Sequence, residues 1–90
     1  MWQIEEATEV KKELRRCPQQ VLAKYEAWKA HVRHGGPQTL RQLSGLKDEA
    51  LKGKLAGFRS SRLNIQWRII YQVQNERVTV VVVQISPHDY

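Results

Sequence analysis

Five basic side chains lie in a stretch of the chain that contains no acidic residue. The stretch runs from Ala50 to Asn75, and its cations are Lys52, Lys54, Arg59, Arg62 and Arg68. Guanidinium and ammonium groups bind phosphate through charge-assisted hydrogen bonds. The chain of 90 residues also carries a formal net charge of +6. We therefore expect this stretch to meet a phosphate-bearing or acidic partner, although a solvated basic surface would have the same composition.

The end of the chain adds two groups that can transfer protons, His88 and Tyr90. RNA cleavage without a metal needs a base for the 2′-hydroxyl proton, cations for the phosphate and an acid for the departing 5′ oxygen. Histidine, tyrosine, arginine and lysine can fill these roles between them. A final strand antiparallel to residues 65–73 would bring His88 and Tyr90 towards Arg68, with a frayed, polar C-terminus as the alternative.

Other kinds of site are disfavoured by what the sequence lacks. It has no Cys or His pair at zinc spacing, no glycine-rich phosphate loop and no Gly-Xaa-Ser-Xaa-Gly elbow, so we expect no metal and no cofactor. His31 and His34 are interpreted as a helix-terminal pair, with a surface metal contact as the alternative. The single cysteine, Cys17, cannot form an internal disulfide, and no apolar run could cross a bilayer. We expect a cytoplasmic protein that does not bind membranes.

The first third of the sequence predicts a strand followed by a helical hairpin. Residues 2–4 alternate apolar and polar, which is typical of a short edge strand. A helix is predicted from Glu5 to Arg16, and Pro18 ends it and can begin the next one. Gly35-Gly36-Pro37 stops the second helix. Apolar residues at helical spacing mark one face of that helix: Val21, Tyr25, Trp28 and Val32.

The last third changes to a two-residue period, which predicts an antiparallel meander. The segment before it, from Gly36 to Leu55, is predicted as a loop with a helical turn. Turns are expected at Asn64 and at residues 74–76, between strands at Phe58–Leu63, Ile65–Val73 and Val78–Ile85. The expected fold is a single α+β domain over residues 1–90, in which a small antiparallel sheet is packed by the N-terminal helical hairpin.

The turn at Asn64 decides which arginine shares a face with Arg68, because side chains alternate along a strand. A two-residue turn would put Arg59 on the face of Arg68, whereas a three-residue turn would pair Arg62 with Arg68. Ile65 is β-branched and disfavours the positive φ that the two-residue turn requires. We therefore predict Arg62 beside Arg68, where the two guanidinium groups would repel unless an anion lay between them.

The segment "RLNIQWRIIYQV", residues 62–73, resembles the signature strand pair of the RelE/ParE toxin superfamily and is especially similar to its HigB-type branch. The lead-in "LSGLKDEALKGKLAGFRSSRLN", the helical hairpin and the ending "PHDY" agree with these toxins in order and length, so the resemblance covers most of the chain. It implies the small sheet and helical hairpin expected above. It also implies a toxin of a type II toxin–antitoxin pair, a metal-independent endoribonuclease that cuts mRNA in the ribosomal A site. A cognate antitoxin, and with it a hetero-oligomer, is implied as well.

The resemblance gives roles to the candidate residues. Arg68 takes the place of the family's conserved arginine, and we expect it to stabilise the phosphate in the transition state. Arg59 and Arg62 are expected to orient that phosphate. His88 and Tyr90 fall where several members keep a C-terminal His or Tyr, and proton transfer is assigned to them. The side chains expected to bind RNA are Lys52, Lys54 and Arg59.

Two other functions are compatible with the sequence. A ParE-like toxin inhibits DNA gyrase through surface complementarity and needs no proton-transfer residues, and one fold can support both activities. His88 and Tyr90, together with the arginines, favour the RNA-cleaving toxin over the gyrase inhibitor. A plain RNA-binding module would bind RNA without arresting growth.

Overall fold

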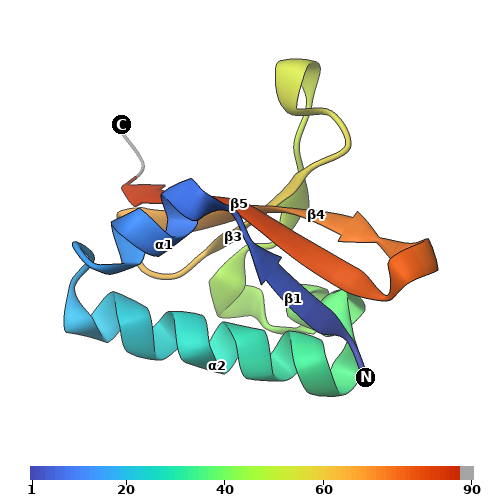
Figure 1. Ribbon diagram of the computed structural model, residues 1–90, viewed down its shortest axis with the longest axis horizontal. Helices are drawn as coiled ribbons and strands as arrows, with labels where there is room; N and C mark the ends of the chain where they lie inside the picture. The colour runs from blue at the N-terminus through green and yellow to red at the C-terminus, as the bar shows by residue number, and fades with distance from the viewer. Residues whose placement is uncertain (88–90) are drawn as a thin grey trace.

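The computed structural model describes residues 1–87, which form a five-stranded mixed sheet with the long helix α2 along one face (Figure 1). The strand order across the sheet is β1-β5-β4-β3-β2. The bounds of the helices and strands are β1 Gln3–Glu6, α1 Thr8–Leu14, α2 Gln19–Gly35, β2 Glu49–Ala50, β3 Arg59–Arg62, β4 Trp67–Gln74 and β5 Thr79–Pro87. Short 3₁₀ helices connect them: η1 Pro37–Gln42, η2 Ser44–Leu46, η3 Gly53–Leu55 and η4 Asn75–Arg77. Within residues 1–87, no helix combines the length and apolar character needed to cross a membrane.

The N-terminal strand joins this sheet and shortens the first helix. β1 pairs with β5 in parallel register, and Glu6 lies opposite Val82. Because this pairing holds residues 3–6 extended, the helix begins at Thr8 rather than at Glu5. The predicted α+β fold is confirmed, with the correction that the sheet is mixed rather than wholly antiparallel.

The apolar stripe of α2 lies in the core, as its spacing predicts. Its four members are each at most 1% exposed: Val21, Tyr25, Trp28 and Val32. Burial of an apolar side chain of this kind contributes about 1.5–3 kcal/mol. Trp28 packs edge-on against Tyr71 of β4, with the ring centroids 5.2 Å apart. This contact holds α2 against the face of the sheet that carries Tyr71.

Side chains alternate between this helix-side face and a second face, which is turned away from α2. We call the second one the open face, and its residues on β3, β4 and β5 include Ser60, Arg62, Arg68, Ile70 and Ser86. The helix-side face carries buried residues of the same strands, among them Ser61, Ile69, Tyr71, Val82 and Ile85. A bulge at Val83 of β5 keeps Val82 and Ile85 on the same face although they are three residues apart.

The turn between β3 and β4 has the three-residue form, which confirms the predicted register. Leu63 N–H donates to the Trp67 carbonyl at 2.8 Å, and Arg62 lies directly opposite Arg68. The Asn64 side chain closes the turn, because its Oδ1 accepts from two backbone N–H groups of the turn at 2.7 and 2.8 Å. The register therefore assigns both arginines to positions on the open face.

The turn between β4 and β5 holds a valine in a backbone conformation that valine rarely adopts. Val78 has φ 49° and ψ 48°, a region that costs an ordinary residue about 1–2 kcal/mol but is freely open to glycine. We expect Val78→Gly to raise the melting temperature by about 4 °C in a thermal-denaturation scan, because the relieved strain exceeds the extra chain entropy. Val78→Ala, which keeps the strain, should give no such rise. A lower melting temperature for the glycine variant would contradict the strain.

Candidate phosphate-binding site

A pocket of about 170 Å³ lies on the open face beside the Asn64 turn. Four charged side chains line it together with Ser60: Lys47, Glu49, Arg62 and Arg68. Glu49 is opposite Ser60 in the β2–β3 ladder, so alternation places it on the same face as the two arginines. The volume suits a phosphate group with its immediate neighbours better than a large cofactor. The pocket thus combines three cations with one carboxylate.

Arg62 and Arg68 lie side by side with no counter-ion among residues 1–87. Residues directly opposite in an antiparallel pair have Cβ atoms about 4.5–5.5 Å apart, and like charges there repel. Arg68 Nε is buried, and no acceptor within residues 1–87 lies within hydrogen-bonding reach. A buried donor without an acceptor is rare in folded proteins. A phosphate oxygen would satisfy the donor and neutralise the pair, so the two arginines have the properties of an anion site.

Arg59 lies on the helix side of the sheet, where it neutralises a buried carboxylate. Its Nε donates to Asp48 Oδ1 at 2.9 Å, and its Nη2 lies 2.7 Å from the same oxygen. Burial would by itself lower the pKa of Arg59, but the hydrogen bonds to Asp48 and Tyr71 raise that pKa above its ordinary value. The structure therefore separates Arg59 from Arg62 and Arg68, with which the sequence grouped it.

Asp48 is the centre of a polar cluster on the helix side, which we call the Asp48 cluster: Asp48, Arg59, Ser61 and Tyr71. Asp48 Oδ2 accepts from Ser61 Oγ at 2.6 Å and from the Tyr71 hydroxyl. Ser61 Oγ in turn accepts from Trp28 Nε1 at 3.0 Å. Burial and the hydrogen bond to Asp48 raise the pKa of Tyr71 above its ordinary value, so this phenol stays a donor at neutral pH. The cluster connects α2, β3 and β4 to the residue that precedes β2.

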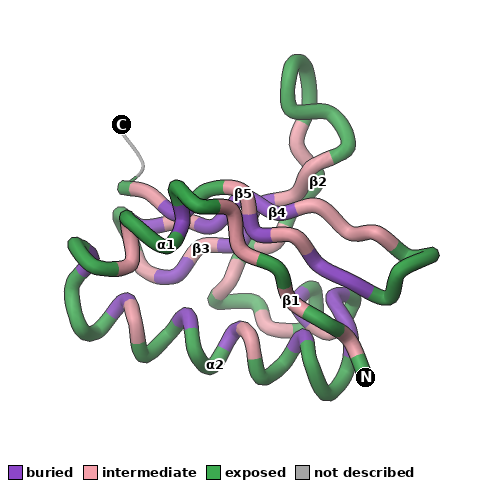
Figure 2. Tube along the Cα trace, in the orientation of Figure 1, coloured by how far each residue is buried: buried purple, intermediate pink, exposed green. Residues whose placement is uncertain are grey.

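The remaining predicted residues do not line the pocket or cannot be placed in it. Lys52 and Lys54 are exposed on the segment between β2 and β3, which projects from the sheet on the side away from α2 (Figures 1 and 2). His88 and Tyr90 lie outside the described residues. The described part of β5 ends at Pro87, opposite Trp67.

Two charged residues of the pocket, Lys47 and Glu49, are not found by sequence reasoning. β2 is only two residues long, so it has no periodicity from which a strand could be predicted. Both residues lie just before the acid-free stretch. The pairing of Glu49 with Ser60 shows which face of the sheet Glu49 lines, and Lys47 is placed there by the pocket that it lines.

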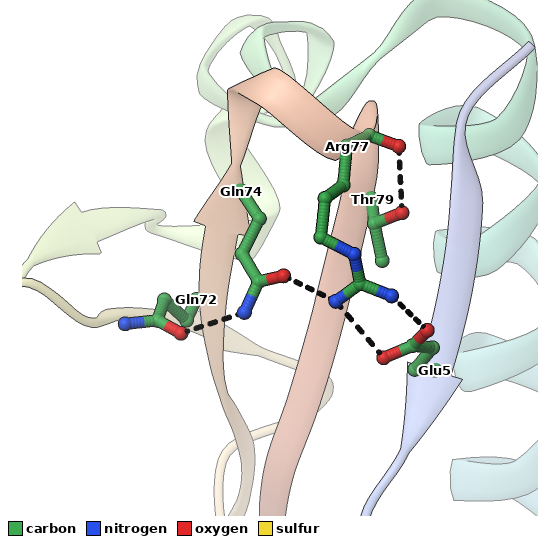
Figure 3. Close-up of polar contacts among 5 residues, drawn as sticks. All are labelled: Glu5, Gln72, Gln74, Arg77 and Thr79. Carbon is green, nitrogen blue, oxygen red and sulfur yellow. Dashed lines mark hydrogen bonds and ion pairs between the residues drawn. The ribbon is translucent and has the colours of Figure 1, made fainter.

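Beyond the other end of the open face, Arg77 and Glu5 form an ion pair (Figure 3). Arg77 Nη2 lies 2.6 Å from Glu5 Oε2, and both side chains are about half exposed. Arg77 also donates to the Gln74 side chain, whose amide donates to Gln72 at 3.2 Å. Arg77, in the turn between β4 and β5, therefore has its own carboxylate, and it serves as a control for the unpaired arginines.

Other features of residues 1–87 are weaker candidates for a functional site than this pocket. A more apolar hollow of about 560 Å³ lies on the helix side between α2 and η2, but no buried side-chain atom without a partner points to a ligand there. Burial raises the pKa of the Cys17 thiol, which makes it a poor nucleophile. No group of three His, Cys, Asp or Glu side chains within the described residues is placed to hold a metal ion.

Comparison with known proteins identifies the fold. No family model and no curated protein matches the sequence. YafQ from E. coli strain BL21(DE3) matches in structure over 97% of this chain and 93% of its own, with a TM-score of 0.78 and 16% identity. The archaeal RelE–RelB complex from Pyrococcus horikoshii OT3 matches over 96% of this chain and 93% of its own, with a TM-score of 0.77 and 17% identity. The chain has the RelE/ParE toxin fold. The YoeB/ParE toxin from Agrobacterium tumefaciens is similar too, over 97% of this chain and 99% of its own, with a TM-score of 0.75 and 21% identity.

The RelE/ParE fold is the one that the strand pair at residues 62–73 predicted, and this prediction is confirmed. Sequence identities between 16% and 21% establish a shared fold and carry no residue roles. The chemistry of this chain must therefore be argued from its own pocket.

Proposed function

We propose that this protein is a toxin of a type II toxin–antitoxin system that cleaves ribosome-bound mRNA in the cytoplasm without a metal. The observation that carries the proposal is the Arg62–Arg68 pair, whose buried Arg68 Nε has no acceptor among residues 1–87. The RelE/ParE fold supports the assignment to toxins, and the pocket supports a phosphate substrate. A single carboxylate, Glu49, completes the pocket.

In the proposed reaction the scissile phosphate lies between Arg62 and Arg68. Glu49 accepts the proton of the 2′-hydroxyl, and the 2′-oxygen attacks phosphorus. The bond from phosphorus to the 5′ oxygen breaks, which leaves a 2′,3′-cyclic phosphate and a 5′-hydroxyl. Arg68 donates to the non-bridging oxygens as charge develops on them. His88 or Tyr90 gives the leaving oxygen its proton, and Lys52 and Lys54 attract the RNA electrostatically.

A cognate antitoxin belongs to the same proposal. RelE of Pyrococcus horikoshii was solved in complex with RelB. The unpaired arginines of the present chain offer a site for acidic side chains of such a partner. We propose that the toxin and its antitoxin form a hetero-oligomer in which carboxylates of the antitoxin occupy the anion site.

Induced expression of the chain without an antitoxin tests the activity. We expect translation to stop and mRNA to show discrete cuts that are absent when Arg68 is replaced by alanine. Mapping of RNA 5′ ends gives the cuts, and incorporation of a labelled amino acid gives the rate of translation. Intact mRNA together with inhibited DNA gyrase would instead assign the chain to the ParE-like class. Affinity for RNA without growth arrest would leave only an RNA-binding module.

Glu49→Gln tests the proposed proton acceptor. Loss of a general base costs about 10²–10⁴-fold in rate, so single-turnover cleavage of ribosome-bound mRNA should fall into that range. The melting temperature should not change, because Glu49 is exposed in the short strand β2. Glu76→Gln, an exposed carboxylate of η4, is the matched control and should cleave like the parent. Unchanged cleavage by Glu49→Gln would remove Glu49 from the mechanism.

A further inference from the structure

Lys47 adopts a backbone conformation that lysine seldom takes. It has φ 45° and ψ 45°, in the left-handed region. Asn can stabilise this region with its own side chain and Gly enters it without steric cost, but Lys has neither advantage. Strained conformations of this kind persist where the surrounding structure imposes them, and they are concentrated at functional sites. The strained backbone therefore marks Lys47 as a candidate functional residue.

At this left-handed bend, consecutive side chains lie on different faces of the sheet. Asp48 belongs to the buried cluster on the helix side, whereas Lys47 and Glu49 line the pocket on the open face. Lys47 forms no ion pair among residues 1–87. It is therefore a third cation of the pocket, contributed by the loop before β2 rather than by the strands that carry Arg62 and Arg68.

The Asp48 carboxylate holds this loop in place. The Asp48 side chain is fully buried and accepts hydrogen bonds from Arg59, Ser61 and Tyr71 of β3 and β4. Residue 48 therefore cannot leave the sheet unless all of these bonds break. Because Lys47 is covalently attached to this anchor, its backbone is held beside the pocket before a ligand arrives. Such pre-organisation reduces the entropy lost on binding.

We propose that Lys47 is a phosphate-binding residue of the pocket and that Asp48 is its positioning residue. The ligand class is the phosphate backbone of single-stranded RNA, and this inference rests on the proposed function. The strain at Lys47 is then retained because glycine, the residue that fits the bend, would remove a cation from the site.

Three substitutions separate the ammonium group from the strained backbone. Lys47→Gly removes the charge and the strain, Lys47→Ala removes only the charge, and Lys47→Arg keeps both. The probe is a short RNA whose cleavage is blocked by 2′-deoxy substitution. We expect the glycine and alanine variants each to lose about tenfold in affinity, as one charge-assisted hydrogen bond predicts. Lys47→Arg should keep most of the affinity.

Two further measurements distinguish a phosphate contact from a structural effect. For the glycine and alanine variants, the slope of log Kd against log salt concentration should fall by about 0.7, the contribution of one phosphate contact to a single strand. The glycine variant alone should melt about 4 °C higher than the parent. Lys11→Ala, which removes an exposed lysine of α1, is the charge control and should keep both affinity and slope.

A double-mutant cycle tests the role of Asp48. Asp48→Asn should weaken binding of the same RNA several-fold in the parent but have no further effect in the Lys47→Gly background, because a positioning residue acts through the group it positions. Equal effects in both backgrounds would overturn the positioning role. Parental affinity and salt slope in Lys47→Gly would overturn the phosphate contact, as would a parent protein that does not bind the probe. A parent that binds the probe but never cuts mRNA would contradict only the proposed function.

Discussion

Arg68→Ala should reduce RNA cleavage by about 10²–10³-fold, because removal of one donor that stabilises transition-state charge costs that much in other enzymes. The measurement is single-turnover cleavage of mRNA on purified ribosomes, with the product ends mapped. Binding of a non-cleavable RNA should weaken much less, since the developing charge is present only in the transition state. Loss of rate with small loss of affinity is the expected signature of Arg68.

The same substitution should leave the fold intact. Arg68 Nε has no hydrogen bond among residues 1–87, and the neighbouring charge of Arg62 repels Arg68. Truncation therefore removes an unfavourable pair from the free protein, and we expect a melting temperature equal to or above that of the parent. Arg77→Ala is the matched control: it removes an arginine of η4 that pairs with Glu5 and should keep full cleavage. A much lower melting temperature for Arg68→Ala would show that Arg68 stabilises the fold.

Much of the fold could be predicted because its signals are local. The stripe on α2 has helical spacing, and all four of its residues are buried. The β3–β4 register followed from one turn, since a β-branched residue after Asn64 disfavours the shorter form. The predicted start of α1 at Glu5 is too early because residues 3–6 pair with β5, about 75 positions later in the chain, and no local pattern reports that pairing.

The site was harder to predict because the roles implied by the resemblance assign Arg59 and Arg62 to the same phosphate, although the predicted register separates them. These residues are three positions apart in one strand, so the register that places Arg62 beside Arg68 puts Arg59 on the other face. Lys47 and Glu49 could not be found from sequence, since β2 is too short to show a period. The burial of Asp48 was equally hidden, because an aspartate between a lysine and a glutamate looks like a solvated charge until its partners are known.

The largest loss of stability should follow from Asp48→Ala. The change leaves the Arg59 guanidinium without its counter-ion, and it removes the acceptor of Tyr71 and Ser61. Breaking a buried ion pair from one side costs about 3–5 kcal/mol, a large part of the free energy of unfolding of a small domain. Urea denaturation followed by circular dichroism should show this loss as a lower midpoint.

Arg59, the ion-pair partner of Asp48, provides an internal control for the Asp48→Ala prediction. Arg59→Met alone should also destabilise the protein, because it leaves the fully buried Asp48 carboxylate without its counter-ion, although two hydroxyl donors to that carboxylate remain. Adding Arg59→Met to Asp48→Ala should recover part of the lost free energy, since no unpaired charge is then left in the core. Purely additive losses would show that the charge pair does not stabilise the fold. A loss below about 1 kcal/mol for Asp48→Ala, the value of an ordinary hydrogen bond, would show that Asp48 does not hold the loop against β3 and β4.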